Sequence, residues 1–101
     1  MFIYNITVKV DNHILQQWLQ WQKDEHIPEI LATNLFTGNK LLRLLDQDDT
    51  ESTTFIIQYF TDKKEKYDIY LSQYASIFRG KAFEKWGNNF VAFRTLMQVM
   101  H

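Results

Sequence analysis

Glu25 and His26 are the residues of this chain best placed to do chemistry, because they stand just before its only proline. An imidazole can act as a general base near neutral pH, and His26 is the candidate for that role, with Glu25 beside it. The alternative is a structural histidine that bonds Glu25, Glu29 or a backbone carbonyl freed by Pro28. In the first interpretation His26 faces a ligand, and in the second it faces other groups of the protein.

The segment before Pro28 has the periodicity of an amphipathic helix. At about 100° per residue, one face of that helix carries an apolar stripe that ends in a carboxylate. The members of this stripe are Ile14, Trp18, Trp21 and Glu25. Pro28 lacks a backbone N–H and disfavours the α conformation of Ile27, so we expect the helix to kink or stop there. Such a break would open a small pocket with Glu25 and His26 at its polar lip.

Two polar residues in predicted strands are further candidates for catalysis. Asn5 interrupts an otherwise apolar strand, and Arg94 stands in the middle of another. Either side chain could stabilise an oxyanion that develops during a reaction. The alternatives are a satisfied amide or cross-strand contact for Asn5 and a structural ion pair for Arg94, because an unpaired guanidinium in mid-strand is costly.

Aromatic residues make up 16% of the chain, which is enough to line a pocket for a flat ligand. Aromatic side chains at helical and strand spacing usually form the core, so we expect a packed core with a pocket at its edge. The residues concerned are Trp18, Trp21, Phe36, Tyr59, Tyr67, Tyr70, Tyr74 and Trp86. The candidate ligand-binding residues are Trp18, Trp21, His26, Phe36 and Tyr59.

Composition argues against several classes of function. A formal net charge of −1 gives no electrostatic footprint for nucleic acid, and no apolar segment is long enough for a membrane span. With no cysteine and no basic leader before an apolar run, we expect a cytoplasmic protein. The other histidines, at an element start and the chain end, are poorly placed to join His26, so we expect no metal and no cofactor. The acidic run 46–51 lacks the turn glycine of a calcium loop and is interpreted as a solvated hairpin loop.

The 101 residues predict a single α+β domain over 1–101. Strand formers alternate or cluster in four segments, 2–10, 40–45, 53–60 and 90–99. Helical periodicity marks 13–26 and 62–86, and we expect the second helix to be capped by Asp62, bent at Gly80 and ended by Gly87. The order βαββαβ predicts a ferredoxin-like fold, an antiparallel four-stranded sheet with two helices on one face.

Both faces of the predicted sheet are largely apolar. In the third strand Phe55, Ile57 and Tyr59 alternate with two apolar residues, Ile56 and Phe60. Helices cover only one face, so the other would leave an apolar patch on the order of the ~800 Å² that each partner buries in a standard interface. We therefore expect a homodimer joined through this sheet face.

Several segments of the chain resemble an uncharacterised family of small bacterial proteins, a domain of unknown function. They are Phe-Ile-Tyr-Asn-Ile-Thr-Val at the start, Trp-Leu-Gln-Trp, His-Ile-Pro-Glu-Ile-Leu-Ala-Thr, Leu-Phe-Thr, Gln-Tyr-Phe and Phe-Val-Ala-Phe-Arg-Thr-Leu. That family resembles the dimeric α+β barrel superfamily, which implies two ferredoxin-like protomers with paired sheets. Haem-degrading members of the superfamily use a first-strand Asn and a second-helix His; Asn5 fits this pattern, but segment 62–86 has no histidine.

Two hypotheses for function remain. The first is a homodimeric protein that is structural or binds a small apolar ligand between sheet and helices, with Glu25 and His26 at the pocket rim. The second is a cofactor-independent monooxygenase or isomerase-like enzyme that acts on an aromatic substrate, with His26 as general base and Asn5 or Arg94 at the oxyanion. The resemblance to the superfamily supports the second hypothesis, and the absence of a complete catalytic motif favours the first.

Overall fold

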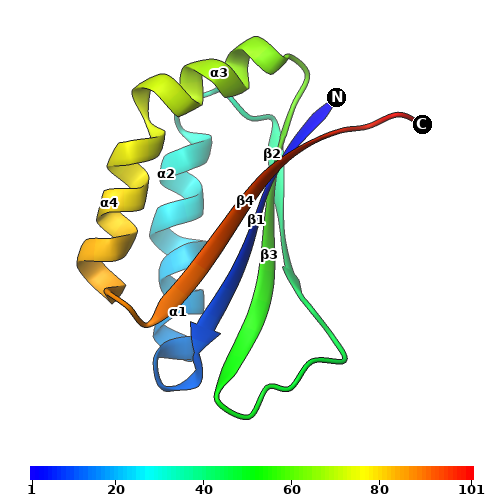
Figure 1. The fold of residues 1–101 in the computed structure, drawn as a ribbon. Helices are drawn as coiled ribbons and strands as arrows, with labels where there is room; N and C mark the ends of the chain where they lie inside the picture. The colour runs from blue at the N-terminus through cyan, green and yellow to red at the C-terminus, as the bar shows by residue number, and fades with distance from the viewer.

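A four-stranded antiparallel sheet forms one layer of the protein, and the helices form a second layer on one of its faces (Figure 1). The computed structural model describes all residues from Met1 to His101. The strands, in the spatial order β2-β3-β1-β4, are β2 Gly38–Arg43, β3 Ser52–Thr61, β1 Phe2–Asp11 and β4 Phe90–Gln98. The α+β, ferredoxin-like prediction is confirmed, and the predicted strand bounds differ from these by up to two residues.

The sheet keeps its register because each strand alternates between a face toward the helices and an open face. On the helix side, Tyr4, Val8 and Val10 of β1 are buried, as are Phe55, Ile57 and Tyr59 of β3. Apolar burial at every second position fixes the pairing, since a slip by one residue would turn these side chains outward. The core therefore lies between the sheet and the helices.

The first helical region is continuous through Pro28, so the predicted kink or stop is wrong. It comprises the short 3₁₀ turn η1 Asn12–Ile14, α1 Leu15–Trp21, the π-turn η2 Gln22–His26 and α2 Ile27–Leu31. Ile27 is helical, with φ −61° and ψ −47°, and its N–H donates to the carbonyl of Gln22, five residues back. The wider π-turn accommodates the proline, because the pyrrolidine ring clashes with a carbonyl only in the tighter α spacing.

The second helical region is two helices, α3 Lys64–Gln73 and α4 Ala75–Trp86, which run in different directions (Figure 1). The break lies at Tyr74, whose φ of −124° leaves the helical range, and the predicted bend at Gly80 is wrong. The predicted cap is wrong as well, because Asp62 pairs with Lys66 at 3.1 Å and the N-cap residue is Lys63. The predicted end at Gly87 is confirmed, with φ 58°, a conformation that glycine adopts without strain.

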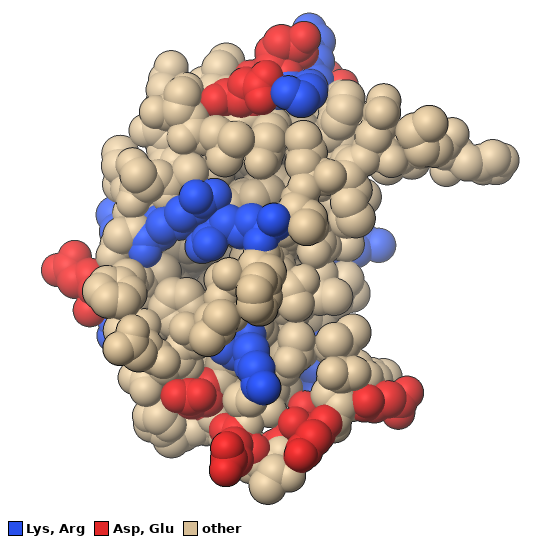
Figure 2. Space-filling model, viewed as in Figure 1, with Lys and Arg blue, Asp and Glu red and all other residues tan.

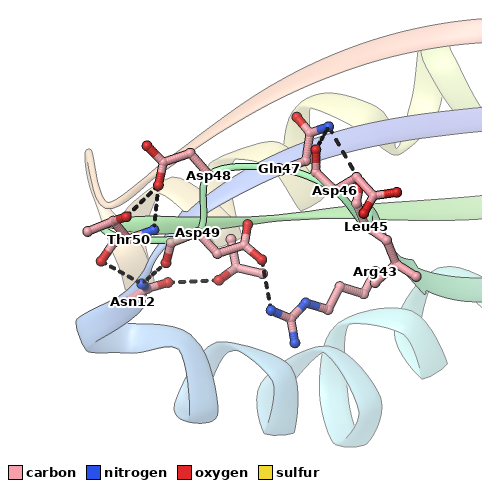
Figure 3. Close-up of polar contacts among 9 residues, drawn as sticks. Asn12, Arg43, Leu45, Asp46, Gln47, Asp48, Asp49 and Thr50 are labelled. Atoms are coloured by element: carbon pink, nitrogen blue, oxygen red, sulfur yellow. Dashed lines mark hydrogen bonds and ion pairs between the residues drawn. The ribbon is translucent and has the colours of Figure 1, made fainter.

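The connection between β2 and β3 is held to the sheet by side chains (Figure 3). Asn12 Nδ2 donates to the backbone carbonyls of Asp49 at 2.9 Å and Thr50 at 3.3 Å, and its Oδ1 accepts from the Thr53 hydroxyl at 2.8 Å. Arg43 pairs with Asp49 at 2.8 Å. Among the acidic side chains of the loop, Asp49 thus pairs with Arg43 and Asp48 accepts from Thr50.

Candidate functional site

The π-turn decides which side chains of the first helical region face the sheet. Gln22 is 4% exposed, and His26, four residues on, also faces the interior, whereas Glu25 is exposed. The prediction that Glu25 points into the core is wrong, because a count of about 100° per residue does not hold through a π-turn. Glu25 instead lines a shallow outer groove between α1 and the end of α4.

A cavity of about 40 Å³ lies where His26 meets the sheet. We call it the interlayer cavity. Apolar side chains of β1, β3, β4 and the helices form most of its wall, among them Ile6, Trp18, Ile57, Ala82 and Ala92. Its polar groups are Gln22, His26, Arg94 and the hydroxyl-bearing Tyr59. A cavity of this size has room for roughly three water-sized groups.

His26 packs among rings. It stacks on Trp21 with centroids 4.3 Å apart, and it meets Phe78 edge-on at 5.9 Å. Burial lowers the pKa of His26 to about 4; nearby Lys81 and Arg94 add to this, and Glu29 opposes it. The ring is therefore neutral at pH 7. The structural interpretation that placed Glu29 beside the ring as its bonding partner is not supported, since Glu29 is held by Lys81 at 2.8 Å.

Arg94 has no carboxylate partner, so the predicted structural ion pair is wrong. The four salt bridges of the protein join Arg43 to Asp49, Lys64 to Asp68, Lys66 to Asp62 and Lys81 to Glu29. Arg79 of α4 is also without a carboxylate and donates to the Tyr4 hydroxyl at 3.3 Å. Figure 2 shows basic side chains across the middle of the face seen there, with acidic side chains mainly at the top and bottom and one acidic group at the left margin.

Two buried oxygens lack a hydrogen-bond partner within the protein, and both belong to residues that line the interlayer cavity together with Arg94. They are Oε1 of Gln22 and the hydroxyl of Tyr59, a residue with no exposed surface. Burial raises the pKa of Tyr59, with further contributions from Tyr70 and Tyr4, so the hydroxyl keeps its proton and can donate it. Sequence reasoning missed Gln22, although its spacing of four residues from both Trp18 and His26 was a usable signal.

The other candidates lie elsewhere. Asn5 is on the open face of the sheet, where its Oδ1 accepts from Gln58 Nε2 at 3.2 Å, so the prediction of a cross-strand contact is confirmed. Phe36 packs against Tyr4, Tyr59 and Tyr70 in the core rather than at the cavity. Trp21 lines the outer groove with Glu25. The structure thus brings His26, Trp18, Tyr59 and Arg94 together and leaves Asn5 on the other side of the sheet.

The sequence pattern of one protein family matches residues 1–100, nearly the whole chain, and it is described as Domain of unknown function (DUF4286). The chain belongs to the DUF4286 family. A search among curated proteins finds no match for this DUF4286 chain.

Several solved structures are similar in fold to the DUF4286 chain. A dimeric ferredoxin-like protein from an uncultured marine organism has a TM-score of 0.75 at 8% identity, over 99% of this chain and 95% of that one. An ethyl tert-butyl ether D (EthD) family protein from Bacillus halodurans has a TM-score of 0.67 at 12% identity, over 99% and 100%. A designed protein with a ferredoxin fold has a TM-score of 0.52 at 14% identity, over 100% and 88%. These likenesses establish the fold of the DUF4286 chain.

Two further findings concern metals and membranes. Nowhere in the DUF4286 chain do three or more His, Cys, Asp or Glu side chains converge as a metal site would require. No helix has both the length and the apolar character needed to cross a bilayer.

Proposed function

We propose that this DUF4286 protein is a homodimeric, non-catalytic protein that binds a small, largely apolar molecule in the interlayer cavity. The observation that carries the proposal is the cavity itself, which lies between sheet and helices and is walled mainly by apolar side chains. Ligand sites commonly combine apolar walls with a few convergent polar groups. The π-turn supports the same place, because π-turns within α-helices are frequent at functional sites.

The open face of the sheet supports a dimer. One row across it runs Leu42, Ile56, Thr7, Phe93, and another runs Phe60, Ile3, Met97. Leu42 is 42% exposed and Phe93 is 67% exposed in the single chain, which is unfavourable for large apolar side chains unless a second copy covers them. The marine fold relative is described as dimeric. We propose that the two sheets pack face to face through these rows.

Catalysis by His26 has less support. A general base works best with a pKa near the operating pH, and the pKa of His26 is about 4. Asn5, one of the two side chains considered for an oxyanion, bonds Gln58 on the opposite face of the sheet. A cofactor-independent monooxygenase or isomerase-like enzyme therefore remains the second candidate, with only Arg94 beside the base.

The binding proposal is tested by NMR of the methyl groups of Ala82 and Ala92, which line the cavity. Neutral probes of increasing size, acetamide, isobutyramide and benzamide, are titrated into the protein. We expect the smallest probe to shift both methyl signals. Ala92→Val, in which Ala82 remains as the reporter, should abolish the shift of the Ala82 methyl signal because two added methyl groups fill the cavity. Ala32→Val, at an exposed position, should leave both shifts unchanged. Failure of acetamide, and of the acetate used as its charged counterpart below, to move the methyl signals would overturn the proposal.

The dimer is tested separately by sedimentation at micromolar concentration, which should give twice the chain mass of 12.2 kDa. Ile56→Asp should lower this mass to that of one chain or unfold the protein, because a charge buried in an interface costs several kcal/mol. Glu51→Gln, an exposed change just before the same strand, serves as the control. A wild-type chain that sediments as a monomer would contradict the interface.

A further inference from the structure

We propose that the ligand of the interlayer cavity is a short-chain carboxylate, held by the Arg94 guanidinium with the Tyr59 hydroxyl and the Gln22 amide. This inference rests on the proposed binding function and adds the chemical class of the ligand. It goes beyond an apolar ligand, because it assigns the polar groups of the cavity a common task.

The charges around the interlayer cavity favour an anionic ligand. The residues that line the cavity include one cation, Arg94, and no aspartate or glutamate. Glu29 is the carboxylate that raises the pKa of His26, and it forms a salt bridge with Lys81 at 2.8 Å. Arg94 and Arg79 are both close enough to Tyr70 to oppose the rise in its pKa that burial causes. Arg94 and Arg79 are exposed to solvent and have no carboxylate partner, so they make the electrostatic potential at this end of the cavity positive, which favours an anionic ligand over a cationic one.

Two buried side chains of the cavity have unused hydrogen-bonding capacity. Tyr59 and Gln22 are each more than nine-tenths buried, line the cavity, and have an oxygen without a partner in the protein. Buried polar groups are nearly always bonded, and each exception requires an explanation. The Tyr59 O–H can donate to a carboxylate oxygen, and the Gln22 amide can present its NH₂ group to the same ligand by rotation of its end. Arg94 adds a planar fork of N–H donors that matches a carboxylate.

The volume of the cavity limits the size of its ligand. A volume of about 40 Å³ is far below the ~300–1,000 Å³ of ordinary ligand pockets, so the cavity excludes aromatic and drug-sized ligands and restricts the ligand to the smallest organic anions, of which acetate is the upper size. Ala82 and Ala92 line the apolar part of the wall, where a short alkyl group would lie. The chemistry of the walls and of the polar groups therefore points to the same small amphiphilic anion.

The test compares acetate with acetamide, a neutral molecule of nearly the same shape, at constant ionic strength. The methyl signals of Ala82 and Ala92 report occupancy in both titrations. We expect acetate to bind at least tenfold more tightly than acetamide. Arg94→Gln should remove this preference, whereas Arg43→Gln, the same change at the opposite edge of the sheet, should preserve it. Arg94 is exposed on an edge strand, so its replacement should leave the fold intact.

Tyr59→Phe provides a second, smaller change, because it removes only the hydroxyl. It should weaken acetate severalfold and acetamide less, because a neutral amide carbonyl accepts a weaker hydrogen bond than a carboxylate does. Equal affinity for acetate and acetamide in the wild type would overturn the carboxylate inference while leaving the binding function standing. No methyl shift with either probe would overturn both.

Discussion

The interlayer cavity and the β2–β3 loop use their polar residues in opposite ways. In the loop, Asp48 bonds the backbone and side chain of Thr50, and Asn12 bonds two loop carbonyls, although most of these groups are exposed to solvent. In the cavity, Gln22 and Tyr59 are buried and lack partners in the protein. The loop resembles a site in its sequence, but most of its polar groups hold the hairpin together, with Asp49 Oδ1 as an exception. Buried polar atoms without a hydrogen-bond partner therefore indicate a candidate binding site better than a run of charged residues on the surface does.

The largest effect is expected from acidification, which tests the cavity side of the comparison. The pKa of His26 is about 4 in the folded protein, whereas an ordinary solvated histidine has a pKa of 6.5, the value we take for the unfolded chain. As pH falls through 6.5 the unfolded chain binds a proton first, so stability is complete above 6.5 and is lost down to about 4. The loss should reach about 3 kcal/mol, since each unit of pKa difference corresponds to about 1.4 kcal/mol.

Urea denaturation at fixed protein concentration, at several values between pH 7.5 and pH 4, measures this effect. The control is His26→Gln, which retains every carboxylate of the chain but lacks the imidazole. The pH slope of the wild type should be the steeper of the two. Parallel stability curves would mean that His26 titrates in the folded protein as it does in the unfolded chain.

The next effect is expected at the loop, where Asn12→Ala removes three hydrogen bonds. Thr53, which is 2% exposed, would lose the acceptor of its hydroxyl and become a buried group without a partner. We expect the free energy of unfolding to fall by about 2 kcal/mol, within the usual cost of orphaning such a group. Asn88→Ala, at an exposed position in the turn before β4, is a control that should change stability little. If Asn12→Ala left the free energy of unfolding unchanged, the contrast between the loop and the cavity would be lost.

A matched pair of tyrosines sharpens the comparison within the core. Tyr59→Phe removes a buried hydroxyl without a partner, so it should raise the free energy of unfolding by about 1 kcal/mol. Tyr4→Phe removes a hydroxyl that accepts a hydrogen bond from Arg79 at 3.3 Å, so this change should lower the free energy of unfolding by a similar amount. Thermal or urea unfolding of the two variants measures the signs. If both variants lose stability, the Tyr59 hydroxyl is bonded in solution and the cavity is not distinctive.

The smallest effect is expected when Asp46 and Gln47 are deleted from the loop. The contacts of Asn12 and Arg43 are made by Asp49 and Thr50, which remain, and loop closure entropy varies slowly with length. Stability should change by less than about 1 kcal/mol. Unfolding with and without calcium checks the interpretation of the acidic run. Stabilisation by calcium that the deletion abolishes would reveal a site in the loop.

The fold could be predicted from sequence because strand formers alternate or cluster in four segments, and these local patterns give the order βαββαβ. The direction of His26 toward the interior also followed from its spacing. Gln22 has the same spacing signal, which was overlooked. The exposure of Glu25 could not be predicted from a regular helical count, because the π-turn shifts the face of each residue. The break at Tyr74 rather than Gly80 has the same character, since it depends on how two helices pack on one sheet.

The π-turn Gln22–His26 also bears on how such a site could arise or disappear. A π-turn within a helix is equivalent to an α-helix with one inserted residue, so deleting a single residue there restores regular winding. The deletion would rotate the part of the helix before the turn by about 100° relative to the part after it. Different residues would then face the sheet. A single codon gained or lost would therefore switch Gln22 and His26 toward or away from the sheet, while the strand order and the sheet register stay as they are.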